Sequence, residues 1–322
     1  MDNMNKINIG VIGTGHLGSF HIEQYKSLNN VNLVGCFDIN KNQTKHIKKK
    51  YDISVFDNLN ELLDMSDAIS VTTPTTAHFS IAKKAMEKNC HVFIEKPITQ
   101  NIQEATQLVN ISEKNNLIIQ VGHIERFNPA FYSLKNQLIN PLFIESHRIA
   151  PFNIRGTDVD VVLDLMIHDI DIVLSIVKSK VKEIRASGIS VLSNSIDTAN
   201  ARVAFENGCV ANMTASRIAQ KKIRKFRFFE ESSYTTIDIL NPSIEKYILS
   251  NNIPDNNQSY VVMNNIKDKY ILYEKCNITN HNALKKELEN FIESIINLQQ
   301  PIIDGYSGLK ALKLAIEIQN SI

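Results

Sequence analysis

The sequence predicts an α/β fold made of an N-terminal parallel sheet and a C-terminal α/β domain with a mostly antiparallel open sheet. Three observations support this prediction. Short apolar runs alternate with helical patterns over the first 122 residues, a glycine-rich turn follows the first run, and later β-type runs follow one another at hairpin spacing. We therefore expect domains over 1–122 and 123–322, with the last helix able to pack back on the first domain.

The first part contains strand signals that are continuous apolar runs, as expected for parallel strands buried on both faces. These runs cover 7–12, 31–38, 68–73, 91–96 and 117–122. Helical patterns separate them: a stretch ending near Leu28, a lysine-rich stretch, residues 77–88, and a stretch before 117. Strand and helix therefore alternate as in right-handed crossover units.

The second part changes rhythm after Gly122. A helical pattern over 129–138 leads to a β-type run over 142–150, a loop, and an amphipathic segment around His168. Further β-type runs cover 181–192, 197–206, 209–218, 225–230, 234–240 and 268–274. Helices over 281–298 and 306–322 close the chain, with Pro301 and Gly305 as breakers between them.

The charge balance argues against nucleic acid or a membrane surface as a partner. The 322 residues carry 35 Lys and Arg against 34 Asp and Glu, a formal net charge of +1, so no global field favours an anionic partner. The first apolar run, of about seven residues, is too short for a secretory core or a membrane span. The four cysteines are far apart with no CxxC pair, which favours a reducing cytoplasm.

The cofactor signal is the sequence G-x-G-x-x-G, formed by Gly13, Gly15 and Gly18 between a strand and a helix. In the Rossmann fold these glycines allow a tight turn and a close approach to a pyrophosphate at the helix N-terminus. Asp38 ends the next strand, where an acid accepts hydrogen bonds from the ribose and repels a 2′-phosphate. We expect NAD rather than NADP; the alternative is a turn without ligand and a surface Asp38.

Two later strand ends extend this expected site. Thr72, Thr73 and Pro74 end a strand at the edge where such sheets bind ligands, although a plain turn with Thr75 or Thr76 as helix cap is the alternative. The full cofactor-binding set that we expect is Gly13, Gly15, His16, Leu17, Gly18, Asp38, Thr72, Thr73, Pro74, His78, Glu95 and Lys96.

Residues Glu95, Lys96 and Pro97 end the strand over 91–96, where reacting groups gather in this fold class. The proline restricts the backbone that carries Lys96, and a cis peptide bond is one conformation open to it. Lys96 is therefore a candidate catalytic residue. The alternative is an ordinary surface lysine.

The segment LDLMIHDIDIV, residues 163–173, places charge inside an apolar helix. Asp164 and His168 are four residues apart and would share a face, with Asp171 three further along and Asp169 pointing elsewhere. A metal site lacks a second histidine or cysteine at ligand spacing, so we expect no metal. A buried core histidine is one alternative; the other is a proton-transfer pair in which Asp164 orients His168.

A basic run over 221–230 interleaves lysine and arginine with phenylalanine. Its alternation predicts a strand with Phe226 and Phe228 on one face and Lys225 and Arg227 on the other, rather than a nucleic-acid surface. Contacts to a substrate diphosphate are expected, as a minority hypothesis, from Arg217, Lys221 or Arg224. Arg126 and Asn128, after the fifth strand, are further substrate candidates, with a structural ion pair as the alternative for Arg126.

Four motifs together resemble the Gfo/Idh/MocA family of NAD(P)-dependent oxidoreductases. They are GxGxxG with Asp38, the EKP sequence after TTPTTAH, GHIERFNPAF, and DLMIHDID. The resemblance implies a Rossmann domain, a C-terminal domain whose open sheet forms a homo-oligomer (dimer or tetramer), and catalytic roles for Lys96, Asp164 and His168. Many members have glycine where this chain has Met166, and this replacement is expected to alter how closely a sugar approaches the helix.

Within the family the chain is most similar to bacterial sugar-nucleotide dehydrogenases. That similarity implies NAD-dependent oxidation of a secondary sugar hydroxyl, the 3-hydroxyl of a UDP-linked N-acetylhexosamine, giving a 3-keto intermediate for lipid A precursor synthesis. Two alternatives stay open: an inositol or free-sugar dehydrogenase of the same family, and a non-catalytic NAD-binding sensor or regulator, which the same fold can also host.

Overall fold

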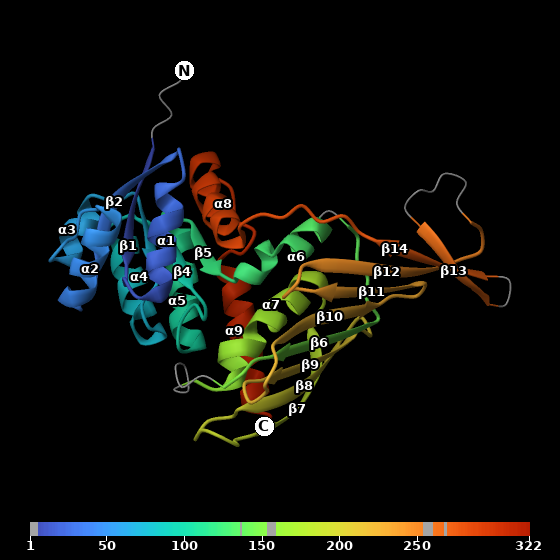
Figure 1. The fold of residues 1–322 in the computed structure, drawn as a ribbon. Helices are drawn as coiled ribbons and strands as arrows, with labels where there is room; N and C mark the ends of the chain where they lie inside the picture. Colours follow the sequence, from blue (N-terminus) through green and yellow to red (C-terminus); the bar gives the residue numbers. More distant parts are fainter. Residues whose placement is uncertain (1–5, 136, 153–158, 254–259, 267–268) are drawn as a thin grey trace. The chain divides into compact units, whose positions relative to one another are not determined.

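The computed structural model describes residues 6–135, 137–152, 159–253, 260–266 and 269–322. The chain forms two compact units (Figure 1). Unit 1 contains residues 1–124 and 282–312, and unit 2 contains 125–281 and 313–322. Residues 282–312 thus group with the N-terminal unit, and the predicted division of function at residue 122 stays a prediction. No helix in the described ranges combines the length and apolar character that crossing a bilayer requires.

Unit 1 is built on a five-stranded parallel sheet with strand order β2-β1-β3-β4-β5. The order reverses direction at β1, so the crevice at the carboxyl ends of β1 and its neighbours is the expected ligand site of such a sheet. The strands are β1 (Ile7–Ile12), β2 (Val31–Phe37), β3 (Ala68–Val71), β4 (His91–Glu95) and β5 (Ile119–Gly122).

The helices of unit 1 cover both faces of this sheet (Figure 1). Helix α8 lies against α1, and α4 lies against α5. The helices are α1 (His16–Lys26), α2 (Lys41–Tyr51), α3 (Leu59–Asp64), η1 (Thr75–Ala77), α4 (His78–Glu87), α5 (Ile102–Asn115) and α8 (Ala283–Asn297). The short η2 (Ile124–Phe127) begins at the last residue of this part and belongs mostly to unit 2. Helix α9 (Gly305–Gln319) contributes its first half to unit 1.

The core of unit 1 brings the two ends of the chain together. Ile9 and Val11 of β1 and Ile22 of α1 share one buried cluster with Phe291 and Ile292 of α8. Full burial of side chains of this size typically contributes about 1.5–3 kcal/mol each. The C-terminal segment therefore stabilises the sheet that carries the glycine fingerprint.

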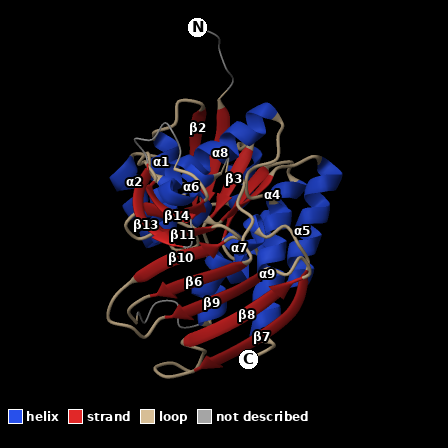
Figure 2. Cartoon of the chain, turned by 90° about the vertical axis from the view of Figure 1, so that its right-hand side faces the viewer, coloured by secondary structure: helices blue, strands red, loops and turns tan. Residues whose placement is uncertain are grey.

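Unit 2 contains a nine-stranded sheet in the order β13-β14-β12-β11-β10-β6-β9-β8-β7 (Figure 2). Every pair is antiparallel except β6 with β9. The strands are β6 (Phe143–Ile149), β7 (Val181–Ile189), β8 (Thr198–Phe205), β9 (Val210–Ser216), β10 (Ile223–Phe229), β11 (Ser233–Asp238), β12 (Ser243–Ser250), β13 (Tyr260–Ile266) and β14 (Lys269–Lys275).

One face of this sheet carries the helices of unit 2. Helix α6 (Pro129–Leu134) packs against β11, and the segment η3 (Val162–Met166) followed by α7 (Ile167–Ile176) packs against β6 and β9. Along β10, Phe226 and Phe228 are 1% and 0% exposed, whereas the side chains of Lys225 and Arg227 are 45% and 39% exposed. The alternation predicted for this strand is confirmed, and its apolar face is in the core.

The predicted fold class is confirmed: a parallel Rossmann sheet and a mostly antiparallel sheet with helices. Several elements were missed. Helix α3 and strands β12 and β13 were not predicted, because their runs are short or polar and their pairing partners are distant in sequence. Residues 136 and 268, within the predicted helix 129–138 and strand 268–274, lie outside the described residues, as do residues 153–158 of the predicted loop.

Candidate active site

The glycine fingerprint forms a tight turn between β1 and α1. Gly13 has φ +90°, and a Cβ at this position would lie 2.8 Å from the carbonyl carbon of Thr72. A Cβ on Gly18 would lie 1.9 Å from the carbonyl oxygen of Gly13. Gly15 differs, because nothing lies within 4 Å of its ideal Cβ. Two of the glycines thus close the turn, and the third leaves open space at the N-terminus of α1, where a pyrophosphate would fit.

Asp38 follows β2 and faces the fingerprint turn. Its Oδ2 accepts hydrogen bonds from the backbone N–H of Thr14 at 2.6 Å and from the Thr14 hydroxyl at 3.0 Å. Its Oδ1 accepts from the backbone N–H of Asn40 at 2.8 Å. The carboxylate is therefore fixed beside the turn, in the position that a ribose-binding acid occupies in this fold.

The end of β3 lies against the same turn. The Thr72 hydroxyl donates to the carbonyl oxygen of Gly13 at 2.6 Å. The buried hydroxyl of Thr73 has no hydrogen-bond partner within the described part of the chain, so it is available to a bound molecule. Pro74 is exposed, and neither Thr75 nor Thr76 caps α4, whose N-cap residue is Ala77. The capping alternative is wrong.

His78 links the ends of β3 and β4. Its Nε2 lies 2.9 Å from the carbonyl oxygen of Thr73, and its Nδ1 lies 2.9 Å from that of Pro97. Burial lowers the pKa of His78, against the two carbonyl contacts and the charge of Glu95, which act in the opposite direction. His78 is therefore a structural link between the two loops that carry the predicted cofactor residues.

The EKP sequence ends β4 in a fixed conformation. The Lys96–Pro97 peptide bond is cis. Glu95 and Lys96 are half-buried, and the backbone N–H of Lys96 donates to Glu95 Oε2 at 3.3 Å. Lys96 thus lies at the carboxyl end of the sheet, on the edge where the fingerprint turn also lies.

The predicted proton-transfer pair lies on unit 2, at the start of η3 and α7. Asp160 caps this segment, since its Oδ1 accepts from the backbone N–H groups of Val162 and Leu163 at 2.9 and 3.1 Å. The sequence predicted a single α-helix here, but the first turn of the observed helix is not α-helical. Residues 162–166 form a π-helical turn, closed by a hydrogen bond from the Ile167 N–H to the Val162 carbonyl. Such turns are frequent at functional sites.

Asp164 and His168 are half-buried, whereas the residues between and beside them are mostly fully buried. Asp169 and Asp171 are 1% and 2% exposed. Met166 is 0% exposed, so it can affect a substrate only through the packing of the helix. The partly exposed pair is therefore Asp164 and His168, and the other two aspartates belong to the interior.

Both buried aspartates have arginine partners. Arg148 Nε donates to Asp169 Oδ1 at 2.7 Å, and Arg126 donates to both oxygens of Asp171, at 2.8 and 3.1 Å. Arg148 also donates to Glu125 at 2.7 Å. The ion pair was one of the two alternatives for Arg126, and the structure contains it. These pairs attach α7 to β6 and to η2, within the three residues that follow His168.

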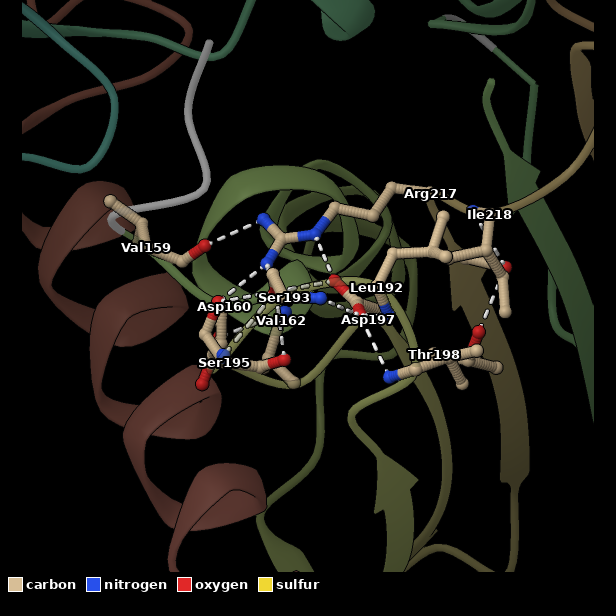
Figure 3. A network of polar contacts seen from close by, with 12 residues as sticks. Val159, Asp160, Val162, Leu192, Ser193, Ser195, Asp197, Thr198, Arg217 and Ile218 are labelled. Carbon is tan, nitrogen blue, oxygen red and sulfur yellow. Dashed lines mark hydrogen bonds and ion pairs between the residues drawn. The ribbon is translucent and has the colours of Figure 1, made fainter. Parts of the chain in front are cut away.

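Arg217 lies at the centre of a polar cluster near the start of η3 (Figure 3). Its Nε donates to Asp197 Oδ1 at 2.9 Å, and its Nη1 donates to the carbonyl oxygen of Val159 at 2.7 Å. Its Nη2 donates to the hydroxyls of Ser193 and Ser195 at 3.1 and 2.5 Å. Arg217 is 4% exposed, and its guanidinium forms these hydrogen bonds with residues of unit 2. A diphosphate contact from Arg217 stays a prediction.

The other substrate candidates also have partners inside unit 2. Asn128 caps α6 by accepting from the Ala130 N–H at 3.1 Å, and its Nδ2 donates to the carbonyl oxygen of Ile239 at 3.0 Å. Arg224 donates to Glu125 at 3.1 Å and has a side chain that is 40% exposed. Lys221 is exposed. Arg224 and Lys221 are thus the candidates that still present charge at the surface.

Sequence reasoning missed two residues of this region. Ile39, directly after Asp38, is 90% exposed, which gives an apolar surface beside the predicted ribose contact. His21 is fully buried on α1 and contacts Glu95. Its place three residues after Gly18 was a usable signal, but only the fold brings it to the end of β4.

In the described ranges, no group of three or more His, Cys, Asp and Glu side chains is arranged to hold a metal ion.

Comparisons with known proteins agree with this geometry. A family model described as oxidoreductase family, NAD-binding Rossmann fold, matches residues 7–123, and one described as GFO/IDH/MocA C-terminal domain matches residues 150–231. The chain is 32% identical to the UDP-N-acetylglucosamine 3-dehydrogenase of Acidithiobacillus ferrooxidans, over 99% of this chain and 98% of that protein. A crystal structure of that enzyme superposes with a TM-score of 0.89, at 31% identity and over 99% and 98% of the two chains.

A more distant relative also spans the whole length. The myo-inositol 2-dehydrogenase of Thermotoga maritima is 24% identical over 98% of this chain and 96% of its own. The chain that carries the glycine fingerprint, the EKP sequence and the helix capped by Asp160 is therefore similar, over its full length, to sugar-nucleotide and inositol dehydrogenases. The chain belongs to the Gfo/Idh/MocA family of oxidoreductases.

Proposed function

We propose that the protein is an NAD-dependent dehydrogenase that oxidises the 3-hydroxyl of a UDP-linked N-acetylhexosamine to a 3-keto sugar nucleotide. The observation that carries this proposal is the full-length similarity to a UDP-N-acetylglucosamine 3-dehydrogenase, at 32% identity and a TM-score of 0.89. The presence of Lys96, Asp164 and His168 in one chain supports catalysis over a sensor role, since cofactor binding alone needs only the fingerprint.

Unit 1 would bind the cofactor. The open space above Gly15, the unpartnered Thr73 hydroxyl and the fixed Asp38 carboxylate fit the pyrophosphate and ribose of a dinucleotide. Asp38 would repel a 2′-phosphate, and the exposed Ile39 offers an apolar surface with no positive charge to bind one. These features favour NAD over NADP. NAD held by these residues would supply the acceptor for the hydride of the sugar carbon.

His168, Asp164 and Lys96 would handle the proton and the oxygen. His168 accepts the proton of the sugar hydroxyl while the carbon–hydrogen bond breaks, and Asp164 orients the imidazole and stabilises its charged form. Lys96 donates a hydrogen bond to the oxygen and stabilises the negative charge that develops there. The alcohol thus loses one hydride and one proton, and the product is the ketone.

We also propose the wider setting of the enzyme. A 3-keto sugar nucleotide is a carbonyl substrate for an aminotransferase, which fits a place in lipid A precursor synthesis. All four cysteines are free thiols, which fits the cytoplasm. A row of aromatic side chains crosses five strands of the nine-stranded sheet, from Phe143 to Tyr273, and suits burial in a dimer or tetramer. Light scattering after gel filtration measures that assembly.

Absorbance at the NADH band, measured with NAD and a panel of substrates, tests the proposed reaction. We expect kcat/KM for UDP-N-acetylglucosamine to exceed that for free N-acetylglucosamine and myo-inositol by at least about tenfold. Reduction of the product with borodeuteride should place deuterium at C3. Preference for myo-inositol would instead establish the free-polyol alternative, and tight NAD binding without turnover on the panel would establish the sensor.

A further inference from the structure

A buried histidine joins the fingerprint helix to the EKP loop. His21 is 0% exposed on α1; its Nδ1 lies 2.8 Å from the Ser70 hydroxyl of β3, and its Nε2 lies 3.0 Å from Glu95 Oε1 at the end of β4. A carboxylate can only accept, so Nε2 carries the hydrogen of that bond. The imidazole therefore holds one oxygen of Glu95 from inside the unit.

The other oxygen of Glu95 is held from the opposite side. Oε2 accepts from the backbone N–H of Lys96 at 3.3 Å, and it lies 2.9 Å from where a Cβ of Gly122 would be. Gly122 pairs with Glu95 across β4 and β5, so the bare glycine leaves room for the carboxylate. The ring of Phe93 packs edge-on against His21 at 5.2 Å between centroids, which restricts the imidazole.

The charges that face Glu95 keep it ionised. Burial opposes ionisation, but the hydrogen bond and charge of His21 and the charge of Lys96 outweigh it, so the pKa of Glu95 lies below its ordinary value. Two further titratable groups feel this carboxylate: Tyr25 of α1, whose pKa is raised mainly by burial, and His78 of α4, whose pKa is lowered by burial. An anion therefore lies beside the Lys96 backbone at neutral pH.

We propose that His21 is a positioning residue for Lys96. It holds the ionised Glu95 carboxylate, and the carboxylate in turn holds the backbone of Lys96 and provides a negative charge beside its ammonium. This assignment rests on the proposed function. An ammonium paired with an anion acts as a hydrogen-bond donor, so the assignment also places Lys96 on the oxygen and leaves the substrate proton to His168.

The first test follows the charge of Glu95 and needs no substrate. Carbon-13 NMR of protein labelled at the glutamate carboxyl, with Glu95→Gln to assign the signal, gives the titration midpoint of Glu95 in each variant. We expect His21→Leu to raise the midpoint by about one pH unit or more. His21→Gln, which keeps a donor, should raise it less. His46→Leu, the same change at an exposed histidine of α2, should leave it unchanged. An unchanged midpoint in folded His21→Leu would overturn the proposal.

The second test follows turnover. In His21→Leu the ratio of kcat to the wild-type kcat should fall as the pH is lowered, because Glu95 is protonated at a higher pH in the variant, whereas a purely structural defect would lower kcat equally across the profile. Gly122→Ala keeps His21 but displaces the Glu95 carboxylate, so we expect kcat to fall at least about tenfold. If His21→Leu does not fold, His21→Gln and Gly122→Ala decide the outcome.

The two tests separate the failure of this proposal from the failure of the proposed function. A wild-type protein that turns over no UDP-sugar contradicts the function, while the NMR titration still decides whether His21 controls Glu95. An active wild type together with a ratio of variant to wild-type kcat that does not change with pH in the His21 variants contradicts the positioning role alone.

Discussion

The guanidinium of Arg148 donates to the carboxylate of Asp169 at 2.7 Å, and Asp169 is the residue directly after His168. Both partners are almost fully buried, at 2% and 1% exposure. Loss of one partner from such a pair leaves an uncompensated buried charge, which typically costs about 3–5 kcal/mol. We therefore expect Arg148→Met to lower the free energy of unfolding by an amount in this range, measured by urea denaturation at pH 7.

Arg227 provides the matched control for this prediction. Arg227 of β10 forms an ion pair at 3.1 Å with Glu145 of β6, the strand that also carries Arg148, but both side chains are about one-third exposed. An exposed pair of this kind contributes at most about 1 kcal/mol, so Arg227→Met should have a small effect. Equal losses of stability in the two variants would contradict the assignment of Arg148 to the support of α7.

Asp197 predicts how stability depends on pH. It is fully buried and accepts from three backbone N–H groups, the Ser193 hydroxyl and Arg217. Burial raises its pKa, but these bonds outweigh burial, so the pKa lies well below the ordinary value. A carboxylate whose pKa is lower in the folded protein than in the unfolded chain stabilises the folded protein. This stabilisation is present above the pKa of the unfolded chain, about 3.9, and is lost as the pH falls below that value.

Asp197→Asn should therefore be less stable than the wild type at pH 7, and the difference should shrink as the pH falls from about 5 towards 3. Thermal unfolding midpoints at several pH values measure this difference. Asp52→Asn, a change at an exposed carboxylate of unit 1, is the control. A difference that stays constant over this range would mean that packing, and not charge, explains the loss.

The fold was predictable because its signals are local. The period-2 and continuous apolar runs identified the strands, and the fingerprint with Asp38 identified the ligand edge of the first sheet. Strands β12 and β13 escaped prediction, because their stability depends on pairing with β11 and β14, which the sequence pattern does not encode. The π-helical turn at residues 162–166 was likewise invisible, since hydrophobic periodicity does not distinguish it from an α-helical turn.

The candidate site was predictable only in part, for a related reason. Asp164 and His168 could be paired from their spacing, and the structure leaves both half-exposed while burying Asp169 and Asp171. A diphosphate contact from Arg217 was a minority hypothesis and stays a prediction, whereas its contacts with Asp197 and Val159 could not be predicted, because only the fold brings these residues to it. His21 lies close to the fingerprint in sequence, but its contact with Glu95, 74 residues away, comes from the fold and could not be predicted.

We expect the change of glycine to alanine to have different effects on stability and on NAD binding at Gly15 and at Gly18. A Cβ on Gly18 would overlap the Gly13 carbonyl, whereas one on Gly15 meets nothing within 4 Å. Gly18→Ala should therefore destabilise unit 1 by at least about 1–3 kcal/mol. Gly15→Ala should leave stability within about 0.5 kcal/mol but weaken NAD binding at least about tenfold, because the methyl group fills the space that a pyrophosphate needs. Urea unfolding and calorimetric titration with NAD distinguish the two effects.

Asp38 and Ile39 predict the choice of cofactor. The double change Asp38→Ser and Ile39→Arg removes the charge that repels a 2′-phosphate and adds one that binds it. We expect the ratio of kcat/KM for NAD to that for NADP to fall at least about tenfold. Asp64→Asn, at an exposed acid of the same unit, should leave the ratio unchanged. A wild type that already prefers NADP would refute the cofactor assignment.

His168 carries the proposed proton transfer, so its removal should affect turnover and spare the cofactor. General-base catalysis typically contributes about 10²–10⁴-fold, and we expect His168→Ala to lower kcat by at least about 10²-fold. NAD binding should be unchanged, because the fingerprint, Asp38 and the EKP loop belong to unit 1 and His168 belongs to unit 2. His147→Ala, at a half-exposed histidine of β6, is the matched control. Turnover within about threefold of the wild type on a verified substrate would transfer the role of base to Lys96, for which Lys96→Met is then the deciding variant.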